Sequence, residues 1–247
     1  MPTIDAAWRL AAEVTKVTTE DDLVDILHEV CARLGCSWFA LSHHIDFMLD
    51  PAKGIRLHNY PDDWERWFDE RGLGLSDPVH RVSQQRLAGF LWRDMAQLDA
   101  PRPDDAEILA HAQHHGIYDG LTIPAHLPGE AHGSVSFAWR RGGDASPEAL
   151  AFAQSVAGFA FEAAKRIAQP EPGAPRPRLT DRQIECLVWA ARGKSNWAIG
   201  RILGLTESTV REHLRNARAR YKAASRISLV IRALFDGAIY FGDVAKG

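Results

Sequence analysis

Aromatic side chains gather around one acidic residue in the first part of the chain. They are Tyr60, Trp64, Trp67, Phe68 and Trp92, with Asp77 among them. An aromatic stripe at helical spacing is typical of a protein core. Tyrosine and tryptophan, however, carry polar tips that need partners when buried, and a nearby carboxylate can bind a ligand. These residues therefore form either a core or the wall of a small-molecule pocket.

A second group of residues, near the C-terminus, suits a polyanion. Arg211, Arg215 and Arg218 would project from the outward face of one helix, where arginine can bridge guanine O6 and N7. Residues 176–247 hold 14 Lys+Arg and 6 Asp+Glu, a formal charge of +8, whereas the rest of the chain carries −11. This asymmetry indicates that only the tail meets nucleic acid. A helical bundle with a solvated arginine face is the alternative.

The sequence contains no pattern that indicates catalysis or metal binding. Cys31, Cys36 and Cys186 are an odd number without paired spacing, which favours reduced, buried thiols. The run Ser42–His44 is a strand fragment without a placed acid, and the histidines at 111, 114 and 115 are expected on the surface of a helix. We therefore expect no enzyme, no metal and no cofactor.

Helical spacing of apolar residues predicts four helices in the basic tail. The hydroxyls of Ser195 and Thr206 can cap the second and third helices. The fourth is predicted over residues 225–235, with Ile227 and Ile231 among its inward residues. Two short helices joined by a glycine turn, the second rich in arginine, form a helix-turn-helix pattern.

The acidic part of the chain alternates helices with strands rich in β-branched and aromatic residues. Helices are predicted over 5–17, 20–34, 103–115 and 147–168, with short ones opening at Pro61 and near Asp77. Strands are predicted over 37–45, 54–60 and 89–92, followed by a hairpin of LTIPAHL and SVSFAWR around PGEAHG. Helices on both faces of a mostly antiparallel sheet make an α/β/α sandwich. The pair Asp21-Asp22 follows threonines at a helix start, which argues against a phosphoreceiver.

The two parts meet at a proline-rich segment, residues 169–178, which reads QPEPGAPRPR. Proline fixes φ and removes a backbone donor, so this segment is expected as a semi-extended tether. The predicted domains are therefore 1–168, a linker over 169–178, and an all-α domain over 179–247. No stretch approaches the roughly 18 apolar residues of a membrane helix, and the N-terminus lacks a signal-peptide pattern. A cytoplasmic protein without a membrane partner is expected.

The C-terminal residues match a known family pattern, which runs L-T-x-R-E, then L-x-W-x-A-x-G-K-S, then S-x-x-T-V-x-x-H. They read Leu179-Thr180-Asp181-Arg182-Gln183, then Leu187, Trp189, Ala191, Gly193-Lys194-Ser195, then Thr206, Thr209-Val210 and His213. This segment resembles the LuxR-type helix-turn-helix domain of bacterial transcription factors. Gln183 replaces the usual Glu and keeps its hydrogen-bonding ability. The resemblance implies a DNA-binding set of Lys194, Ser195, Thr206, Thr209, Arg211, Arg215 and Arg218.

The aromatic segment carries a second resemblance. The residues are Asn59-Tyr60-Pro61-x-x-Trp64-x-x-x-Phe68, Asp77-Pro78-Val79, Trp92, and Gly116-Ile117-x-x-Gly120-x-Thr122-x-Pro124. They resemble the autoinducer-binding domain of the quorum-sensing LuxR family. Phe68 departs from the family's usual Tyr, which bears on acyl-chain preference more than on lactone recognition.

This resemblance implies an N-acyl-homoserine lactone as the ligand. Trp64 would donate its indole N–H to the lactone carbonyl, and Asp77 would accept from the ligand amide. Tyr60 would donate to the acyl carbonyl, with Ser136 as a second hydroxyl nearby. Trp92 would pack on the lactone ring. Phe68 completes the ligand-binding set.

The sequence thus predicts a quorum-sensing transcription factor that binds an N-acyl-homoserine lactone. It would bind an inverted repeat in double-stranded DNA as a homodimer, with RNA polymerase as a further candidate partner. The alternative is a LuxR-type solo regulator whose sensor takes a different small molecule. Acyl chain length and the direction of regulation stay open.

Overall fold

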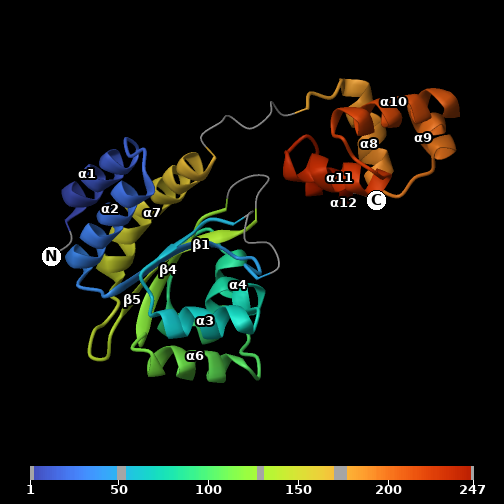
Figure 1. The fold of residues 1–247 in the computed structure, drawn as a ribbon. Coiled ribbons are helices and arrows are strands. Elements are labelled where there is room, and N and C mark those ends of the chain that lie inside the picture. The colour runs from blue at the N-terminus through green and yellow to red at the C-terminus, as the bar shows by residue number, and fades with distance from the viewer. Residues whose placement is uncertain (1–2, 49–53, 127–130, 170–176, 246–247) are drawn as a thin grey trace. The chain divides into compact units, whose positions relative to one another are not determined.

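The computed structural model describes residues 3–48, 54–126, 131–169 and 177–245 (Figure 1). Within these ranges, residues 3–169 form one compact unit and residues 177–245 a second. Most of the predicted linker (residues 170–176) and part of the predicted hairpin (residues 127–130) lie outside the described residues. No helix in the described ranges is long and apolar enough to cross a membrane.

The first unit is built on a five-stranded sheet in the order β2-β1-β5-β4-β3. Its strands are β1 (Trp38–His43), β2 (Arg56–His58), β3 (Phe90–Leu91), β4 (Asp119–Pro124) and β5 (Gly133–Trp139). Every neighbouring pair is antiparallel, in line with the mostly antiparallel sheet predicted from the sequence. The predicted strand over 89–92 is shorter than expected, because Trp92 already opens the 3₁₀ turn η3 (Trp92–Asp94).

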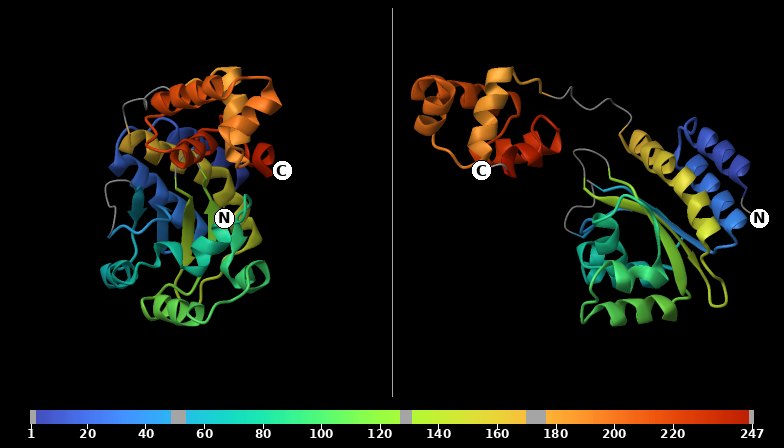
Figure 2. Two further views of the ribbon diagram at one scale, coloured as in Figure 1. Left: turned by 90° about the vertical axis from the view of Figure 1, so that its right-hand side faces the viewer. Right: turned by 180° about the vertical axis from the view of Figure 1, so that it is seen from behind.

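One face of this sheet is covered by three helices, α1 (Ile4–Val14), α2 (Glu20–Leu34) and α7 (Pro147–Ala168) (Figures 1 and 2). Successive strand side chains point to opposite faces, so Phe39 and Leu41 of β1 both face the helices. They pair with Phe137 and Val135 of β5, and all four are fully buried in the largest core cluster. This apolar face is the structural base of the unit.

Capping residues fix where the helices on this face begin and end. The Thr19 hydroxyl accepts the N–H of Asp22 at 3.2 Å, and Gly35 ends α2 with φ of +70°. The helix predicted over 5–17 ends earlier, at Val14, because the Thr15 hydroxyl turns back to the carbonyl of Ala12 at 2.7 Å. Short polar side chains favour such caps because they satisfy backbone groups that the helix leaves unpaired.

The opposite face of the sheet is covered by shorter helices. These are α3 (Asp62–Glu70), η2 (Leu73–Leu75), α4 (Pro78–Gln84), α5 (Met95–Leu98) and α6 (Asp105–His114). Helices therefore lie on both faces of the sheet, and the predicted α/β/α sandwich is confirmed (Figure 2). The strand residues that point to this second face include the hydroxyl side chains of Ser42, Thr122 and Ser136, in contrast to the apolar first face.

The second unit is all α-helical. Its helices are α8 (Asp181–Ala191), α9 (Asn196–Leu203), α10 (Glu207–Arg220), α11 (Arg226–Phe235) and the short α12 (Phe241–Ala245). The four predicted helices are present, and α12 is an addition. Leu187, Ile199, Val210 and Leu229 form a fully buried centre.

The inward face of α11 differs from the prediction. Ile227 and Ile231 were expected inside, but they are 73% and 48% exposed. Leu229 and Ala233 are the fully buried residues of this helix instead. Because α11 is apolar on more than one side, its periodicity alone fits two inward faces, and packing against α8 and α10 selects one.

Candidate ligand pocket and DNA-recognition helix

Helix α3 presents aromatic side chains toward the polar face of the sheet. Pro61 is its N-cap residue and follows Tyr60, and the helix starts at Asp62. Trp64 is buried, with its ring 5.4 Å from that of Trp67 and 5.7 Å from that of Phe68. Residues three and four apart lie on one helix face, so this spacing turns a single helix into an aromatic wall.

Asp77 is the N-cap residue of α4 and is 6% exposed. Its Oδ1 accepts the backbone N–H of His80 at 3.0 Å. Its other carboxylate oxygen accepts no hydrogen bond from the residues that the structure describes, and Asp77 lines a cavity. A buried carboxylate oxygen without a donor is costly, and this atom is free to accept a hydrogen bond from the cavity side.

A chain of hydrogen bonds crosses from the β3 edge into the sheet. Trp92 donates its indole N–H to the hydroxyl of Thr122 at 2.8 Å. Thr122 in turn shares a 2.8 Å hydrogen bond with Ser136 on β5. Gly120 leaves the space that this indole needs, since a Cβ there would lie 2.6 Å from the Trp92 ring. The tryptophan is thereby fixed in position from two sides.

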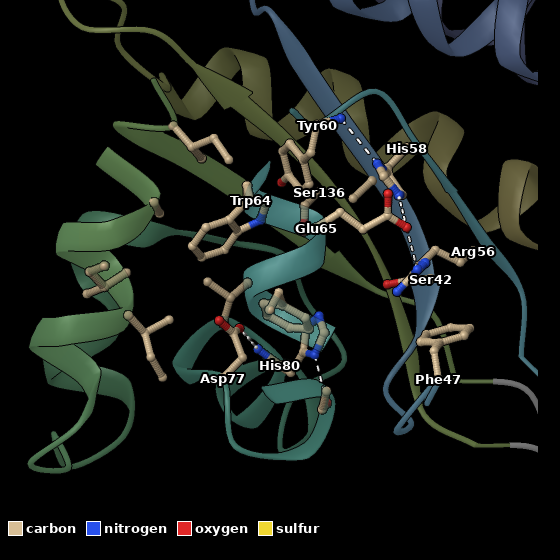
Figure 3. Close-up of a pocket in the computed structure, with 18 of the residues that line it drawn as sticks. Ser42, Phe47, Arg56, His58, Tyr60, Trp64, Glu65, Asp77, His80 and Ser136 are labelled. Carbon is tan, nitrogen blue, oxygen red and sulfur yellow. Dashed lines mark hydrogen bonds and ion pairs between the residues drawn. The ribbon is translucent and has the colours of Figure 1, made fainter. Parts of the chain in front are cut away.

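These side chains surround one cavity of about 90 Å³ (Figure 3). The structure places all six residues of the predicted ligand-binding set in its lining: Tyr60, Trp64, Phe68, Asp77, Trp92 and Ser136. Apolar side chains from α4 and α6 complete the wall, among them Val79 and Ile108. A mostly apolar pocket with a few placed polar groups is the usual form of a small-molecule site.

Two polar donors face this cavity without a protein partner. Neither the Tyr60 hydroxyl nor the Trp64 indole N–H donates a hydrogen bond to any residue in the described ranges, although both residues line the pocket. Burial, together with the charge of Asp77, raises the pKa of Tyr60, so its hydroxyl stays protonated. Together with Asp77, these two side chains give this part of the pocket two donors and one carboxylate acceptor.

Sequence reasoning missed five polar or charged residues of the lining. They are Ser42, Arg56, His58, Glu65 and His80. Alternation in the predicted strand over 54–60 was an available signal for Arg56 and His58, since residues 56 and 58 share a face. His80 packs on the buried His44, with ring centroids 4.0 Å apart. No local pattern predicts that stacking.

The rings of His111 and His115 pack beside the aromatic side chains of α3. The His111 ring stacks on that of Trp67 at 3.8 Å, and His111 Nε2 lies 3.2 Å from His115 Nε2. Both are half-buried, whereas His114 is exposed. The described residues contain no group of His, Cys, Asp and Glu that could hold a metal ion. Cys31 and Cys186 are buried thiols as expected, and Cys36 is half-buried.

In the second unit, hydroxyl caps set the helix-turn-helix. Ser195 accepts the N–H of Ala198 and Thr206 accepts that of Thr209, each at 3.2 Å. Gly204 ends α9 with φ of +67°. At the start of α8, Thr180 and Gln183 form a reciprocal capping box. Gln183 therefore keeps the hydrogen bonds expected of it.

Helix α10 presents its arginines to solvent. The side chains of Arg211 and Arg215 are 69% and 73% exposed, and each has a glutamate of the same helix as its ion-pair partner. Of the other predicted DNA-binding residues, Lys194, Ser195 and Thr206 are exposed and Thr209 is half-buried.

Arg218 is placed differently from the other two arginines. Its guanidinium donates to the carbonyls of Ala223 and Ala224, in the turn that follows α10. Arg218 therefore ties the end of the helix to the next segment, a role that the sequence pattern did not indicate.

Comparisons with known proteins agree with this architecture. Residues 19–164 match the family model described as autoinducer binding domain, and residues 177–233 match that of the bacterial regulatory proteins, luxR family. The chain is 29% identical to the transcriptional activator protein VanR of Vibrio anguillarum, over 94% of this chain and 96% of VanR. It is 34% identical to the quorum sensing-dependent regulator RpaR of Rhodopseudomonas palustris, over 74% of each chain.

Solved structures share the fold. SdiA of Escherichia coli matches with a TM-score of 0.65 at 20% identity, over 94% of this chain and 97% of SdiA. SdiA in complex with octanoyl-rac-glycerol matches with a TM-score of 0.67 at 22% identity, over 97% and 98% of the two chains. The relatives are transcriptional regulators and not enzymes. This chain belongs to the LuxR family of autoinducer-binding transcriptional regulators.

Proposed function

We propose that the protein is a quorum-sensing transcription factor whose pocket binds an N-acyl-homoserine lactone. The unpartnered polar groups of the pocket carry this proposal. An indole N–H at Trp64, a carboxylate oxygen at Asp77 and a phenol at Tyr60 give a donor, an acceptor and a donor around one cavity. A lactone carbonyl, an amide N–H and an acyl carbonyl present the complementary sequence of groups.

The hydroxyl chain supports the same ligand. Thr122 accepts from Trp92 and has one proton of its own. If Thr122 gives that proton to Ser136, the Ser136 hydroxyl is left to donate into the cavity. Two donors, Ser136 and Tyr60, would then meet the acyl carbonyl, and Trp92 would be held against the lactone ring.

The second candidate is a solo regulator that senses another acyl compound. The SdiA complex with octanoyl-rac-glycerol favours this candidate, since that ligand is a glycerol ester. A glycerol ester has no amide N–H, so Asp77 would accept from a glycerol hydroxyl instead. The two ligand classes therefore differ in the donor that they present to Asp77, an amide N–H or a hydroxyl.

For the DNA-binding unit we propose that α10 enters the major groove. Arg211 and Arg215 would read base edges, while Lys194, Ser195, Thr206 and Thr209 would lie along the phosphates. Arg218, first expected to read bases, would instead hold the end of α10 through the carbonyls of Ala223 and Ala224. The exposed apolar residues Ile227 and Ile231 on α11 support the proposal of a homodimer, because an exposed apolar face can pack against a second copy. Two such units bind half-sites one helical turn apart, roughly 34–36 Å, in an inverted repeat. A DNA-binding regulator of this kind would work in the cytoplasm.

The test is a melting experiment on the full chain. It compares a panel of N-acyl-homoserine lactones with octanoyl-rac-glycerol. A ligand at 100 times its Kd should stabilise the folded state by about 2.7 kcal/mol. A lactone that raises Tm, and that mass spectrometry recovers from the purified protein, supports the proposal. Stabilisation by the glycerol ester and by no lactone would favour the second candidate.

A further inference from the structure

The pocket has a polar side that the lactone headgroup does not use. It is formed by Ser42, Arg56, His58 and Glu65, here called the Arg56 cluster. Figure 3 shows Arg56 and Ser42 on one side of the pocket and Trp64 and Asp77 on the other. Arg56 and His58 come from the edge strand β2, and Ser42 is the register partner of Arg56 on β1.

Strand register places this cluster at the end of a row that starts near Trp92. Thr122 pairs with Ser136, Ser136 with Ala40, and Ala40 with His58. Neighbouring strands lie roughly 4.8 Å apart, so the three steps from Thr122 to His58 span about 14 Å. An acyl group whose carbonyl meets Ser136 would extend along this row past Ala40 and end at the Arg56 cluster.

Hydrogen bonds inside the cluster leave specific atoms unused. His58 Nδ1 accepts the backbone N–H of Tyr60 at 3.2 Å, which puts its ring proton on Nε2. His58 Nε2 lies 3.2 Å from Glu65 Oε1, and Arg56 donates a hydrogen bond to the same oxygen. Among the described residues, nothing donates to Glu65 Oε2 and nothing pairs with the Ser42 hydroxyl, although both residues line the pocket.

Charge adds to this excess of acceptors. Asp69 accepts from the guanidinium of Arg56 with both carboxylate oxygens, at 2.7 and 2.8 Å. The Cζ of Arg56 lies 4.4 Å from the centroid of the Phe47 ring. Glu65 is thus the second carboxylate, after Asp69, that accepts hydrogen bonds from the Arg56 guanidinium. Its side chain is only 34% exposed, so a hydrogen-bond donor that comes from the ligand would stabilise it.

We infer that the ligand's acyl group ends in a hydrogen-bond donor, such as a terminal hydroxyl, which Glu65 and Ser42 hold. This inference rests on the lactone proposal and deepens it by naming the acyl class. A plain alkyl end would displace water from the Arg56 cluster without replacing the hydrogen bonds that the water made. Sites built to bond a hydroxyl discriminate strongly against the analogue that lacks it.

The experiment uses the full chain and matched ligand pairs. N-hexanoyl-, N-octanoyl- and N-decanoyl-homoserine lactone are each compared with the form that carries a hydroxyl on the last carbon, by calorimetric titration. We expect the hydroxylated member to bind at least tenfold more tightly at the length that reaches the cluster. Glu65→Leu should reverse that ratio, and Glu65→Gln should reduce it.

Asp69→Asn is the matched control. Asp69, like Glu65, lies on α3 and binds Arg56, but it does not line the pocket. This variant should keep the preference for the hydroxyl. Ser42→Ala gives a second pocket variant, should Glu65→Leu fail to fold, and should also lower the ratio.

The possible failures are distinguishable. If no lactone of the panel binds the wild type, the lactone proposal is wrong and the inference falls with it. If lactones bind but the alkyl members are equal or better at every length, only the inference is overturned. A ratio that both Glu65 variants leave unchanged also overturns it.

Discussion

Arg81 on α4 and Asp105 at the start of α6 form a buried ion pair with two parallel hydrogen bonds, 2.8 and 2.9 Å long. Arg81 also donates to the carbonyl of Ser76, the residue before Asp77, and to Asp99. The Arg81 guanidinium holds the pKa of the Asp105 carboxyl below its usual range. One arginine thereby fixes the segment that carries the pocket carboxylate.

The first prediction concerns this pair. Asp105→Ala should lower the free energy of unfolding by up to about 3–5 kcal/mol, because the buried Arg81 loses its bidentate partner and keeps only Asp99 as a counter-charge. Urea denaturation of the full chain measures the loss. Asp144→Ala is the control, since Asp144 pairs with Arg93 but is 73% exposed; such surface pairs contribute about 0–1 kcal/mol. Equal losses in the two variants would contradict the role of the buried pair.

The second prediction concerns Asp77. Asp77→Asn should keep the start of α4, because asparagine caps helices as well as aspartate does. It should weaken lactone binding by about 1.5–3 kcal/mol, since the charged acceptor is lost. A dose-response curve for transcription, together with the melting curve of the unliganded variant, separates the two effects. A response curve that overlays the wild type would contradict the assigned role.

The third prediction separates the basic residues of the DNA-binding unit. Arg211→Ala or Arg215→Ala should cost about 1–3 kcal/mol on the cognate site and reduce discrimination between base pairs. Lys194→Ala should weaken all sequences about equally and reduce the salt slope by about one unit. Binding to cognate and scrambled duplexes across a salt series measures both. If Arg211→Ala lowers affinity equally for both duplexes, α10 contributes only its positive charge and does not read base pairs.

Arg218→Ala should behave differently from these variants. Because Arg218 bonds the carbonyls after α10, its removal should also lower the Tm of the DNA-binding unit. The Tm in Arg211→Ala should stay near that of the wild type, since the exposed pair with Glu207 contributes little.

The fourth prediction is a pH dependence. Burial, with the charges of the neighbouring histidines, lowers the pKa of His44 well below its ordinary 6.5. The unfolded chain therefore binds a proton below pH 6.5 that the folded chain does not. Stability is fully present above pH 6.5 and falls as the pH drops below it, by up to about 1.4 kcal/mol per pH unit from this one group.

The variant that tests this dependence is His44→Phe, which keeps a ring against His80 and removes the titration. Urea denaturation between pH 7.5 and 5 should give a shallower loss of stability for the variant than for the wild type. Parallel curves would show that His44 does not carry the dependence.

Local features of this protein could be predicted from its sequence, because local interactions decide them. The hydroxyl caps at Ser195 and Thr206 bond backbone groups three residues away, and helix α7 occupies the predicted residues 147–168. Alternation along the strands and the helical spacing of Trp64 and Phe68 likewise depend only on neighbours in the chain. The resemblance of the aromatic segment then named a ligand-binding set, and its role in binding stays a prediction.

Features that depend on contacts between residues far apart in the sequence were decided only by the tertiary structure. The Arg56 cluster combines two strands with α3, and Arg81 meets Asp105 across 24 positions of the chain. No periodicity encodes such partners, because a charged residue can pair with any opposite charge that the fold brings near. The inward face of α11 is a further example: helical spacing fits either Ile227 or Leu229 inside, and only the packing of three helices buries Leu229 and leaves Ile227 in water.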